Sequence, residues 1–331
     1  MKAVQFTGYG DIAANVLLAD IDKPSISDDE VLIETYAAGV NPLDFKVIEG
    51  GLKQVKRFKF PATLGYDVSG IIVEKGANVV DFNIGDEVYS KVNMQGTFTE
   101  FVAVNQNIIG LKPKNLSFEE AASLPLVALT AIQSLQRGKI KKNDKVLIHA
   151  GSGGVGSIAI QYAKSKGAYV YTTTSTENVA WVKELGADRV IDYKKEDYKT
   201  IVKDIDLVLD TLGDEFTADA FKVIKNGASV ITLVGPVDEE TANRMRLNGV
   251  AKLYLKWKRR QITKLIKSKS AYYSLVLMRA NVKQLNEIAE LVEAGKIKPK
   301  IDQVFSLKDT LNALLYIKKG RTKGKVVIKV K

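Results

Sequence analysis

A glycine-rich turn between an apolar run and a helix-forming segment is the stretch of this chain best suited to chemistry. Gly151, Gly153 and Gly156 occupy the glycine positions of the pattern G-x-G-x-x-G, directly after the apolar run Val146–Ile148. In such a turn the first glycine permits a tight bend, the second lets the backbone approach a pyrophosphate, and the third lets the helix pack close to the strand. The first N–H groups of the helix then face the phosphates. The spacing predicts a dinucleotide site.

The segments around this turn alternate between strand-like and helix-like patterns. Apolar runs of strand length lie at residues 146–150, 169–173, 189–193, 206–213 and 229–235. Helical stretches separate these runs, and such alternation predicts an α/β fold with a doubly wound parallel sheet of the Rossmann type. The ligand of such a sheet binds at the carboxyl ends of its strands, which is where the glycine turn lies.

The first part of the chain has a different pattern. Short β-rich pieces separated by turn residues fill residues 1–123, and the polar segment 41–59 is expected to form a loop with a helical turn. Ser117 and Glu120 have the spacing of a capping box that begins a helix, and Pro125 is expected to break or kink that helix. The last apolar run, residues 325–330, is expected to pair with the sheet of this β-rich domain.

Composition limits the kinds of site that the chain can hold. It has 331 residues, no cysteine and one histidine, so a disulfide, a cysteine nucleophile and a cysteine metal site are excluded. The histidine, His149, lies just before the glycine turn and is expected to pack there. The N-terminus lacks the apolar core of a signal peptide, and no apolar run approaches about 20 residues. We therefore expect a cytoplasmic protein.

The net charge of +11 is concentrated in one stretch of the chain. Between Thr241 and Ser270 there are ten Lys and Arg residues and no acidic residue. Leu253, Trp257 and Leu265 have helical spacing there, so a charged helix face or a lid is the simplest interpretation of residues 244–269. A nucleic-acid or membrane-surface binder is the alternative, although neither partner is expected for the chain as a whole.

Six further motifs accompany the glycine turn and spread over nearly the whole chain. They are Gly39–Asp44, Pro61–Gly70, Gly85–Val88, Ala121–Pro125, Leu185–Asp188 and Gly324–Val327. With the glycine turn, they make the chain resemble the zinc-independent branch of the medium-chain dehydrogenase/reductase superfamily, specifically quinone oxidoreductases and enone (alkenal) reductases. The resemblance implies a GroES-like catalytic domain at residues 1–123 and 281–331, a Rossmann domain at residues 124–280, and a homodimer.

The resemblance also bears on metal chemistry. Zinc alcohol dehydrogenases of this superfamily carry cysteine and histidine ligands where this chain has Asn41 and Tyr66, so no metal is expected. Without a Lewis acid to polarise an alcohol or a ketone, the hydride acceptor must already be electrophilic. We therefore expect a quinone or an α,β-unsaturated carbonyl compound (an enone or enal) as the substrate.

The residues after the second Rossmann strand favour NADPH over NADH. An NAD-selective site usually places a carboxylate there to bind the ribose 2′-OH, whereas this chain has the hydroxyl residues Thr172–Ser175. In the similar reductases a serine, a lysine and a tyrosine bind the 2′-phosphate. Ser175 and Tyr193 match this set, and Asn178 stands where the lysine would be.

The resemblance extends the cofactor site beyond the glycine turn. Thr130 and residues 233–235 are expected to border the nicotinamide, and residues 210–213 the adenosine side. The expected cofactor-binding residues are Thr130, Gly151, Ser152, Gly153, Gly154, Val155, Gly156, Thr174, Ser175, Asn178, Tyr193, Leu212, Leu233, Val234, Gly235 and Lys325.

Three residues of the first domain are the catalytic candidates by resemblance: Asn41, Lys46 and Tyr66. After hydride transfer the substrate becomes an enolate or hydroquinone anion, which needs hydrogen-bond donors. Each residue also has a structural interpretation, because Asn41 precedes Pro42 and suits a turn, Lys46 suits a solvated surface, and Tyr66 suits a packed wall. Solvent is an alternative source of the proton.

Two other functions share this architecture. An enoyl-thioester reductase has the same fold, and a cofactor-binding protein without catalytic activity keeps the same glycine turn. Turnover of an enone, a quinone and an enoyl-CoA, with NADPH and with NADH, would separate the three functions.

Overall fold

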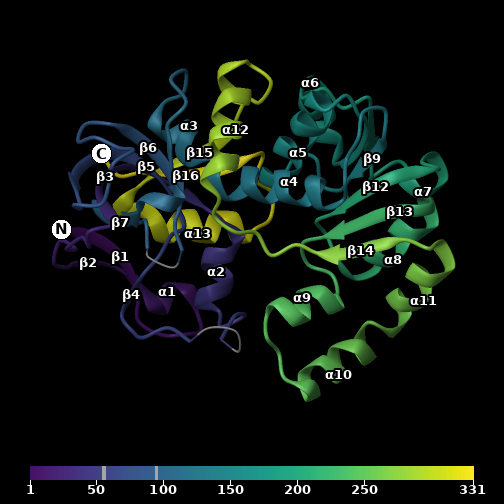
Figure 1. The fold of residues 1–331 in the computed structure, drawn as a ribbon, viewed down its shortest axis with the longest axis horizontal. Helices are drawn as coiled ribbons and strands as arrows, with labels where there is room; N and C mark the ends of the chain where they lie inside the picture. The colour runs from purple at the N-terminus through teal and green to yellow at the C-terminus, as the bar shows by residue number, and fades with distance from the viewer. Residues whose placement is uncertain (54–56, 94–95) are drawn as a thin grey trace. The chain divides into compact units, whose positions relative to one another are not determined.

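The computed structural model describes residues 1–53, 57–93 and 96–331, so residues 54–56 of the expected polar loop lie outside the described residues. The chain divides into two compact units. Unit 1 comprises residues 1–129 and 280–331, and unit 2 comprises residues 130–279. Each unit has its own β-structure (Figure 1), and each has its own hydrophobic core.

Unit 2 contains one sheet of six strands, and every neighbouring pair is parallel. In spatial order the strands are β11 (Arg189–Asp192), β10 (Tyr169–Thr174), β9 (Lys145–Ile148), β12 (Ile205–Asp210), β13 (Ile224–Thr232) and β14 (Tyr272–Leu275). The chain runs outward from β9 to β11 and then returns to the other side of β9 at β12. The doubly wound parallel sheet expected from the sequence is confirmed, and its topological switch point lies between β9 and β12.

The helices of unit 2 pack against both faces of this sheet (Figure 1). Helix α5 (Gly154–Ser165) contacts β9 and β10, and α6 (Val179–Glu184) contacts β11. Helix α8 (Asp214–Val223) contacts β12 and β13, and the short α7 (Tyr198–Ile201) contacts α8. Their apolar side chains and those of the strands form the core of the unit, which holds the carboxyl ends of β9, β10, β12 and β13 in fixed register.

Unit 1 is β-rich, as the sequence predicts. Its larger sheet has the order β15, β16, β3, β5, β6 and β8, with β7 also paired to β3. The bounds are β3 (Glu30–Val40), β5 (Asp67–Lys75), β6 (Glu87–Lys91), β7 (Phe101–Asn105), β8 (Ile109–Leu111), β15 (Ile301–Ser306) and β16 (Lys325–Lys329). The smaller sheet contains β2 (Val16–Asp20), β1 (Lys2–Phe6) and β4 (Ala62–Thr63). Strand β16 pairs with β3, so the final apolar run returns to the first domain as expected.

The helices of unit 1 begin and end at clear local signals. They are α1 (Ile12–Asn15), α2 (Pro42–Ile48), α3 (Phe118–Ala122), α12 (Val282–Glu293) and α13 (Thr310–Lys318). The expected capping box at α3 is confirmed, because Ser117 Oγ accepts from Glu120 N–H while Glu120 accepts from Ser117 N–H. The expected break at Pro125 is also present, and the next helix, α4 (Pro125–Arg137), begins there and carries the chain into unit 2.

The basic stretch 244–269 forms two helices rather than one. They are α10 (Gly249–Lys258) and α11 (Arg260–Lys269), and the preceding helix α9 (Glu239–Arg244) ends where the stretch begins. The expected single stripe of Leu253, Trp257 and Leu265 is wrong: Leu265 packs against the core of unit 2, whereas Leu253 and Trp257 on α10 are exposed. Among the described residues, no helix is long and apolar enough to cross a membrane.

Candidate functional site

The glycine turn at the end of β9 has the geometry that its sequence predicts. A Cβ atom on Gly151 would lie 2.2 Å from Thr172 Oγ1, and one on Gly156 would lie 2.3 Å from the carbonyl oxygen of Ala150. Both glycines are therefore required for the close approach of turn, strand and helix. A Cβ atom on Gly153 would meet only the Ala150 oxygen, at 3.4 Å, so the second glycine leaves room above the turn.

The start of α5 is available to an anion. Gly153 is the N-cap residue of this 12-residue helix, and no side chain caps its first turn. The N–H groups of Gly154, Val155 and Gly156 therefore begin the helix at the open side of the turn. Because the turn is open and the helix is uncapped, these residues fit the pyrophosphate of a dinucleotide.

Four of the expected cofactor-binding residues lie together just beyond or at the ends of β10 and β11. They are Thr174, Ser175, Asn178 and Tyr193. Asn178 Nδ2 donates to Ser175 Oγ at 3.0 Å and to Ser152 Oγ at 3.4 Å, which joins the glycine turn to the end of β10. The backbone N–H of Tyr193 donates to the Thr174 carbonyl at 3.1 Å, and the Tyr193 side chain is exposed. Within the described residues, Thr174 Oγ1 and Asn178 Oδ1 are buried and have no hydrogen-bond partner.

An ion pair that the sequence analysis missed borders this cluster. Lys194 Nζ lies 3.0 Å from Glu177 Oε2, and both side chains are about half exposed. The Glu177 carboxylate accepts hydrogen bonds from its own backbone N–H, from Lys194 and from Ser175, and these lower its pKa to about 2. A carboxylate and an ammonium group therefore both stand beside Ser175. In the sequence, only their positions point to them: Glu177 lies two residues after Ser175, and Lys194 lies one residue after Tyr193.

Asp210 holds two loops at the sheet end that were expected to border the cofactor. Its carboxylate accepts from the N–H groups of Leu212 and Gly213, both at 3.0 Å, and from Thr232 Oγ1 at 2.9 Å. Burial raises the pKa of Asp210, but hydrogen bonds from His149, Thr217 and Gly213 N–H outweigh it and hold the pKa at about 2. Asp210 therefore remains an anion that anchors the end of β12.

Thr232 extends this anchor to the end of β13. Its hydroxyl oxygen accepts from the N–H of Gly235 at 2.8 Å and of Val234 at 3.3 Å. Leu212 and Val234, both expected to border the cofactor, are exposed at the two loop tips. Thr130, the other residue expected near the nicotinamide, lies in α4 and is largely buried.

His149 contacts Asp210 from within the core of unit 2. It is fully buried, its Nδ1 lies 3.4 Å from Asp210 Oδ1, and its ring meets Tyr198 and Phe216 edge-on. The expectation that this histidine packs at the turn is confirmed. A ring held in that way can orient Asp210 but has no route to a ligand outside the core.

In unit 1, a buried polar cluster surrounds Asn41. Asn41 is fully buried, donates from Nδ2 to Asp67 Oδ2 at 2.9 Å, and accepts at Oδ1 from Lys325 Nζ at 2.6 Å. Lys325 Nζ also donates to the Val40 carbonyl at 3.0 Å and to Asp67 Oδ2 at 3.3 Å. Burial raises the pKa of Asp67 above its ordinary value. Asn41 and Lys325 thus join the start of α2 to β5 and β16, and their contacts with substrate and cofactor stay predictions.

Tyr66 and Lys46 lie in different surroundings. Tyr66 is largely buried, and it lines a small cavity together with Asp44 and Thr63. Burial raises the pKa of Tyr66 above its ordinary value, and the nearby Asp44 adds to the shift. Lys46 is exposed on α2, the helix that also carries Asp44. The structure thus brings Asn41, Asp44 and Tyr66 near one another and leaves Lys46 in solvent.

Known proteins match this chain over its whole length. A family model described as an alcohol dehydrogenase GroES-like domain matches residues 27–114, and one described as a zinc-binding dehydrogenase matches residues 185–328. The 2-methylene-furan-3-one reductase of Solanum lycopersicum is 35% identical over 340 residues, covering 99% of this chain and 79% of that protein. The chain belongs to the medium-chain dehydrogenase/reductase superfamily.

Two further similar proteins indicate which group of this superfamily the chain resembles in sequence and fold. The mitochondrial NAD(P)H oxidoreductase of Homo sapiens is 38% identical over 342 residues, covering 96% of this chain and 84% of that protein. The quinone oxidoreductase from Coxiella burnetii has a TM-score of 0.86 and 33% identity, covering 100% of this chain and 99% of its own. The expected likeness to quinone oxidoreductases and enone reductases is confirmed, and the chain is an oxidoreductase.

The donor set of this medium-chain dehydrogenase/reductase does not favour a metal. Over residues 1–53, 57–93 and 96–331, no group of three or more His, Cys, Asp or Glu side chains could hold a metal ion. The chain has no cysteine, and its one histidine is fully buried beside Asp210. Asn41 and Tyr66, which the resemblance aligns with zinc ligands, belong to the buried surroundings described above. Zinc independence stays a prediction.

Proposed function

We propose that this oxidoreductase uses NADPH to reduce a conjugated enone or enal, or a quinone, without a metal ion. The observation that carries the proposal is the open glycine turn linked through Asn178 to the hydroxyl of Ser175. Names of two relatives support the substrate class, because a 2-methylene-furan-3-one is a conjugated enone and the Coxiella burnetii protein is a quinone oxidoreductase.

The proposed cofactor contacts follow the residues of unit 2. The turn and the start of α5 bind the pyrophosphate, and Ser152, Ser175 and Tyr193 surround the adenosine ribose. When bound, the reduced nicotinamide supplies the hydride. We propose that Lys194 supplies the positive charge for the 2′-phosphate that Asn178, at the position of the relatives' lysine, does not. Glu177 opposes that charge, so the Lys194–Glu177 pair sets how strongly NADPH is preferred.

The proposed substrate contacts lie on unit 1. A substrate that has accepted a hydride carries negative charge on oxygen, and hydrogen-bond donors stabilise it. Tyr66 is proposed as such a donor, because a phenol is protonated at neutral pH and can donate its O–H, and burial, which raises the pKa of Tyr66, does not change that. Lys46 is proposed as an exposed cation that attracts the developing charge. Asn41 is proposed to fix the position of α2 rather than to contact the substrate, because its side chain is already bonded to Asp67 and Lys325.

Removal of Lys194 tests the cofactor part of the proposal. In the Lys194→Ala variant we expect the KM for NADPH to rise about tenfold, because a charge-assisted contact to the 2′-phosphate is lost. The KM for NADH should stay the same, since NADH lacks that phosphate. Steady-state kinetics with both cofactors and one enone measure the effect.

Lys195→Ala is the matched control for this experiment. Lys195 is the next residue and also exposed, but it pairs with Asp192 instead of Glu177, so its removal should leave both KM values unchanged. A Glu177→Gln variant should increase the preference for NADPH. Equal losses with NADPH and NADH in Lys194→Ala, or equal losses in the two lysine variants, would remove Lys194 from the cofactor site.

The substrate part of the proposal is tested by a turnover panel. Enone, quinone and enoyl-CoA substrates are compared with NADPH, and the expected order has enone or quinone well above enoyl-CoA. A strong preference for enoyl-CoA would instead identify an enoyl-thioester reductase. Tight NADPH binding without turnover of any of the three would identify a binding protein.

A further inference from the structure

Helix α10 presents an apolar face that the fold does not cover. Val250, Leu253, Tyr254 and Trp257 are 81%, 69%, 54% and 59% exposed. Their spacing of i, i+3, i+4 and i+7 places them on one side of the helix. No residue of α10 is buried, and the helix contacts its neighbours α9 and α11 (Figure 1). These four residues are called the α10 apolar face.

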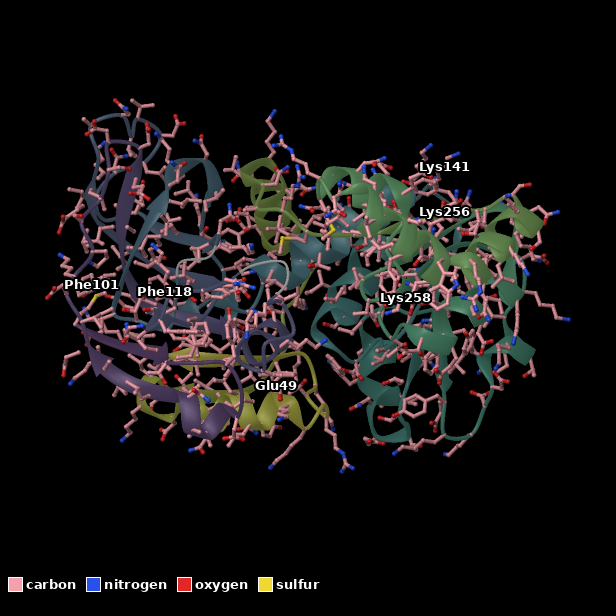
Figure 2. The ribbon with its side chains drawn as sticks, turned by 90° about the horizontal axis from the view of Figure 1, so that it is seen from below. Glu49, Phe101, Phe118, Lys141, Lys256 and Lys258 are labelled. Carbon is pink, nitrogen blue, oxygen red and sulfur yellow. The ribbon has the colours of Figure 1, made fainter. Side chains whose placement is uncertain are left out.

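Positive charges lie beside this face and on the opposite side of the helix. Lys252, Lys256 and Lys258 lie on α10 itself, and Arg259 and Arg260 follow directly. They belong to the stretch between Thr241 and Ser270, which has ten positive charges and no acidic residue. Ion pairs of unit 2 occur elsewhere, for example between Lys199 and Asp219 and between Lys164 and Asp188. Figure 2 shows the side chains of Lys256 and Lys258 on this helix.

The aromatic residues of the face are arranged together with the cations. The rings of Tyr254 and Trp257 are stacked with centroids 6.3 Å apart. Lys258 Nζ lies 5.8 Å from the Tyr254 ring, and the Arg260 guanidinium lies 4.6 Å from the Trp257 ring. Tyrosine and tryptophan favour the interface between lipid and water, because one part of each ring system is apolar and another is polar.

We propose that α10 lies on the surface of a membrane that contains anionic lipids. A helix of this kind lies in the plane of the interface, with its apolar side at the boundary of the acyl chains and its Lys and Arg residues at the headgroups. Its 10 residues span about 15 Å at 1.5 Å per residue, so the contact is peripheral. The proposal does not depend on which substrate the enzyme reduces.

Two other occupants fit the residues less well. RNA would match the charges and the aromatic rings, but it offers no apolar environment for Val250 and Leu253, the two most exposed residues of the face. A second copy of the chain would cover the apolar residues, but a symmetric contact would bring two sets of like charges together. An anionic bilayer satisfies the aliphatic, aromatic and cationic residues at once.

Flotation with lipid vesicles tests the proposal on the full-length protein. We compare vesicles of phosphatidylcholine alone with vesicles that contain about one third phosphatidylserine, close to an anionic leaflet. The wild type should float with the anionic vesicles and remain unbound with phosphatidylcholine alone. Binding should weaken as salt is raised, because salt screens the attraction.

Two variants of α10, one in its apolar residues and one in its lysines, make the test specific. Leu253→Ser/Trp257→Ser removes apolar contacts, and Lys256→Glu/Lys258→Glu reverses two charges; each should weaken binding at least about tenfold. Lys141→Glu/Lys142→Glu is the matched control, since it makes the same charge change at exposed residues outside the basic stretch. All variants should retain wild-type circular dichroism and reductase turnover, because α10 contributes no buried residue.

Several outcomes would overturn the proposal. Wild-type protein that does not float with anionic vesicles contradicts it directly, and so does an equal loss of binding in the control variant. Binding to single-stranded RNA, without vesicle binding, would assign the face to nucleic acid. A dimer in light scattering that dissociates in Leu253→Ser/Trp257→Ser, again without vesicle binding, would assign it to a second copy.

Discussion

Asp44 is a buried carboxylate of unit 1 whose charge responds to pH. Its Oδ2 accepts from the backbone N–H of Asn41 at 2.7 Å, while its Oδ1 is buried without a partner among the described residues. Burial raises the pKa of Asp44 to about 7. Because Asp44 and Tyr66 line the same cavity, protonation near neutral pH changes the electrostatic field at the proposed hydrogen-bond donor.

The raised pKa of Asp44 predicts how stability changes with pH. The folded-state pKa lies above the ordinary value of 3.8, so the folded state binds more protons between the two values. The resulting stabilisation is complete below about pH 4 and is lost as the pH rises to about 7, at up to about 1.4 kcal/mol per pH unit. Asp44→Asn, which keeps an acceptor for Asn41 N–H, should lack this loss when Tm is measured across that range.

Asp86→Asn is the control for the Asp44 measurement. Asp86 also accepts from a backbone N–H three residues earlier, that of Asn83, at 2.8 Å, but it is not fully buried. Its substitution should leave the pH dependence of Tm as in the wild type. The same pH dependence in Asp44→Asn and the wild type would contradict the assignment of a raised pKa to Asp44.

Thr232 provides a prediction for the loops that are proposed to border the cofactor. Thr232→Val keeps the shape of the side chain but removes the oxygen that accepts from the N–H of Gly235 and donates to Asp210. With about 1 kcal/mol lost, we expect the Kd for NADPH to rise about fivefold, measured by fluorescence titration. Thr200→Val, at a hydroxyl that bonds to the Asp197 carbonyl, should bind as the wild type does. Equal affinities in the two variants would show that the loop needs no such anchor.

Some residues of the cofactor region could not be predicted because their partners come from separate loops. Glu177 follows β10 and Lys194 follows β11, and only the parallel pairing of these strands brings them within 3.0 Å. Asp210 was expected near the adenosine side, but its bonds to Thr232 and to two backbone N–H groups depend on register between β12 and β13. The glycines, in contrast, act within six consecutive residues, so their spacing was sufficient.

At the scale of elements, glycine serves two purposes in the turn between β9 and α5. One glycine allows close packing, and another leaves room for a ligand. Gly156 is required by packing, because a Cβ atom there would clash with the Ala150 carbonyl, whereas a Cβ atom on Gly153 would make only an ordinary contact with the same oxygen, at 3.4 Å. The φ angle of Gly153 is −78°, which any residue can adopt. Folding and ligand binding can therefore be separated by substituting the two glycines in turn.

Alanine at these two positions should have different consequences. Gly156→Ala should lower Tm and reduce soluble yield, because backbone must move to relieve the clash, at a cost of about 1–3 kcal/mol. Gly153→Ala should keep the wild-type Tm but raise the Kd for NADPH about tenfold or more, since the methyl group stands where the pyrophosphate approaches. Calorimetry gives both quantities. Gly153→Ala binding NADPH as tightly as the wild type would place the phosphates elsewhere.

The elements that the sequence predicted well were those with strong local signals. The strands of unit 2, the start of α3 and the break at Pro125 follow from apolar runs, a capping box and a proline. The basic stretch was harder, because helical spacing does not reveal where a helix ends or which face meets a core. The chain turns at Arg259, so Leu265 packs inward while Leu253 and Trp257 remain exposed.

At the scale of the whole molecule, the glycine turn lies on unit 2, and the proposed substrate residues lie on unit 1. Unit 1 is made of two separate segments of the chain, whereas unit 2 is one continuous segment. Unit 1 is closed by β16, whose Lys325 bonds to the Asn41 region nearly the whole chain length away. Unit 2 is continuous from residue 130 to residue 279 and contains both the glycine turn and the basic helices. The proposed phosphate turn, the proposed substrate residues and the proposed membrane contact use different side chains, so each can be altered separately.

The most direct test of the proposed function follows the hydride itself. The enzyme is given NADPH that carries deuterium at the transferable C4 position, together with a simple conjugated enone, and the product is examined by NMR. We expect a saturated ketone with deuterium at the former β-carbon and an equivalent amount of NADP⁺. A saturated ketone without the label, or no reduction of the enone or of a quinone at any NADPH concentration, would contradict it.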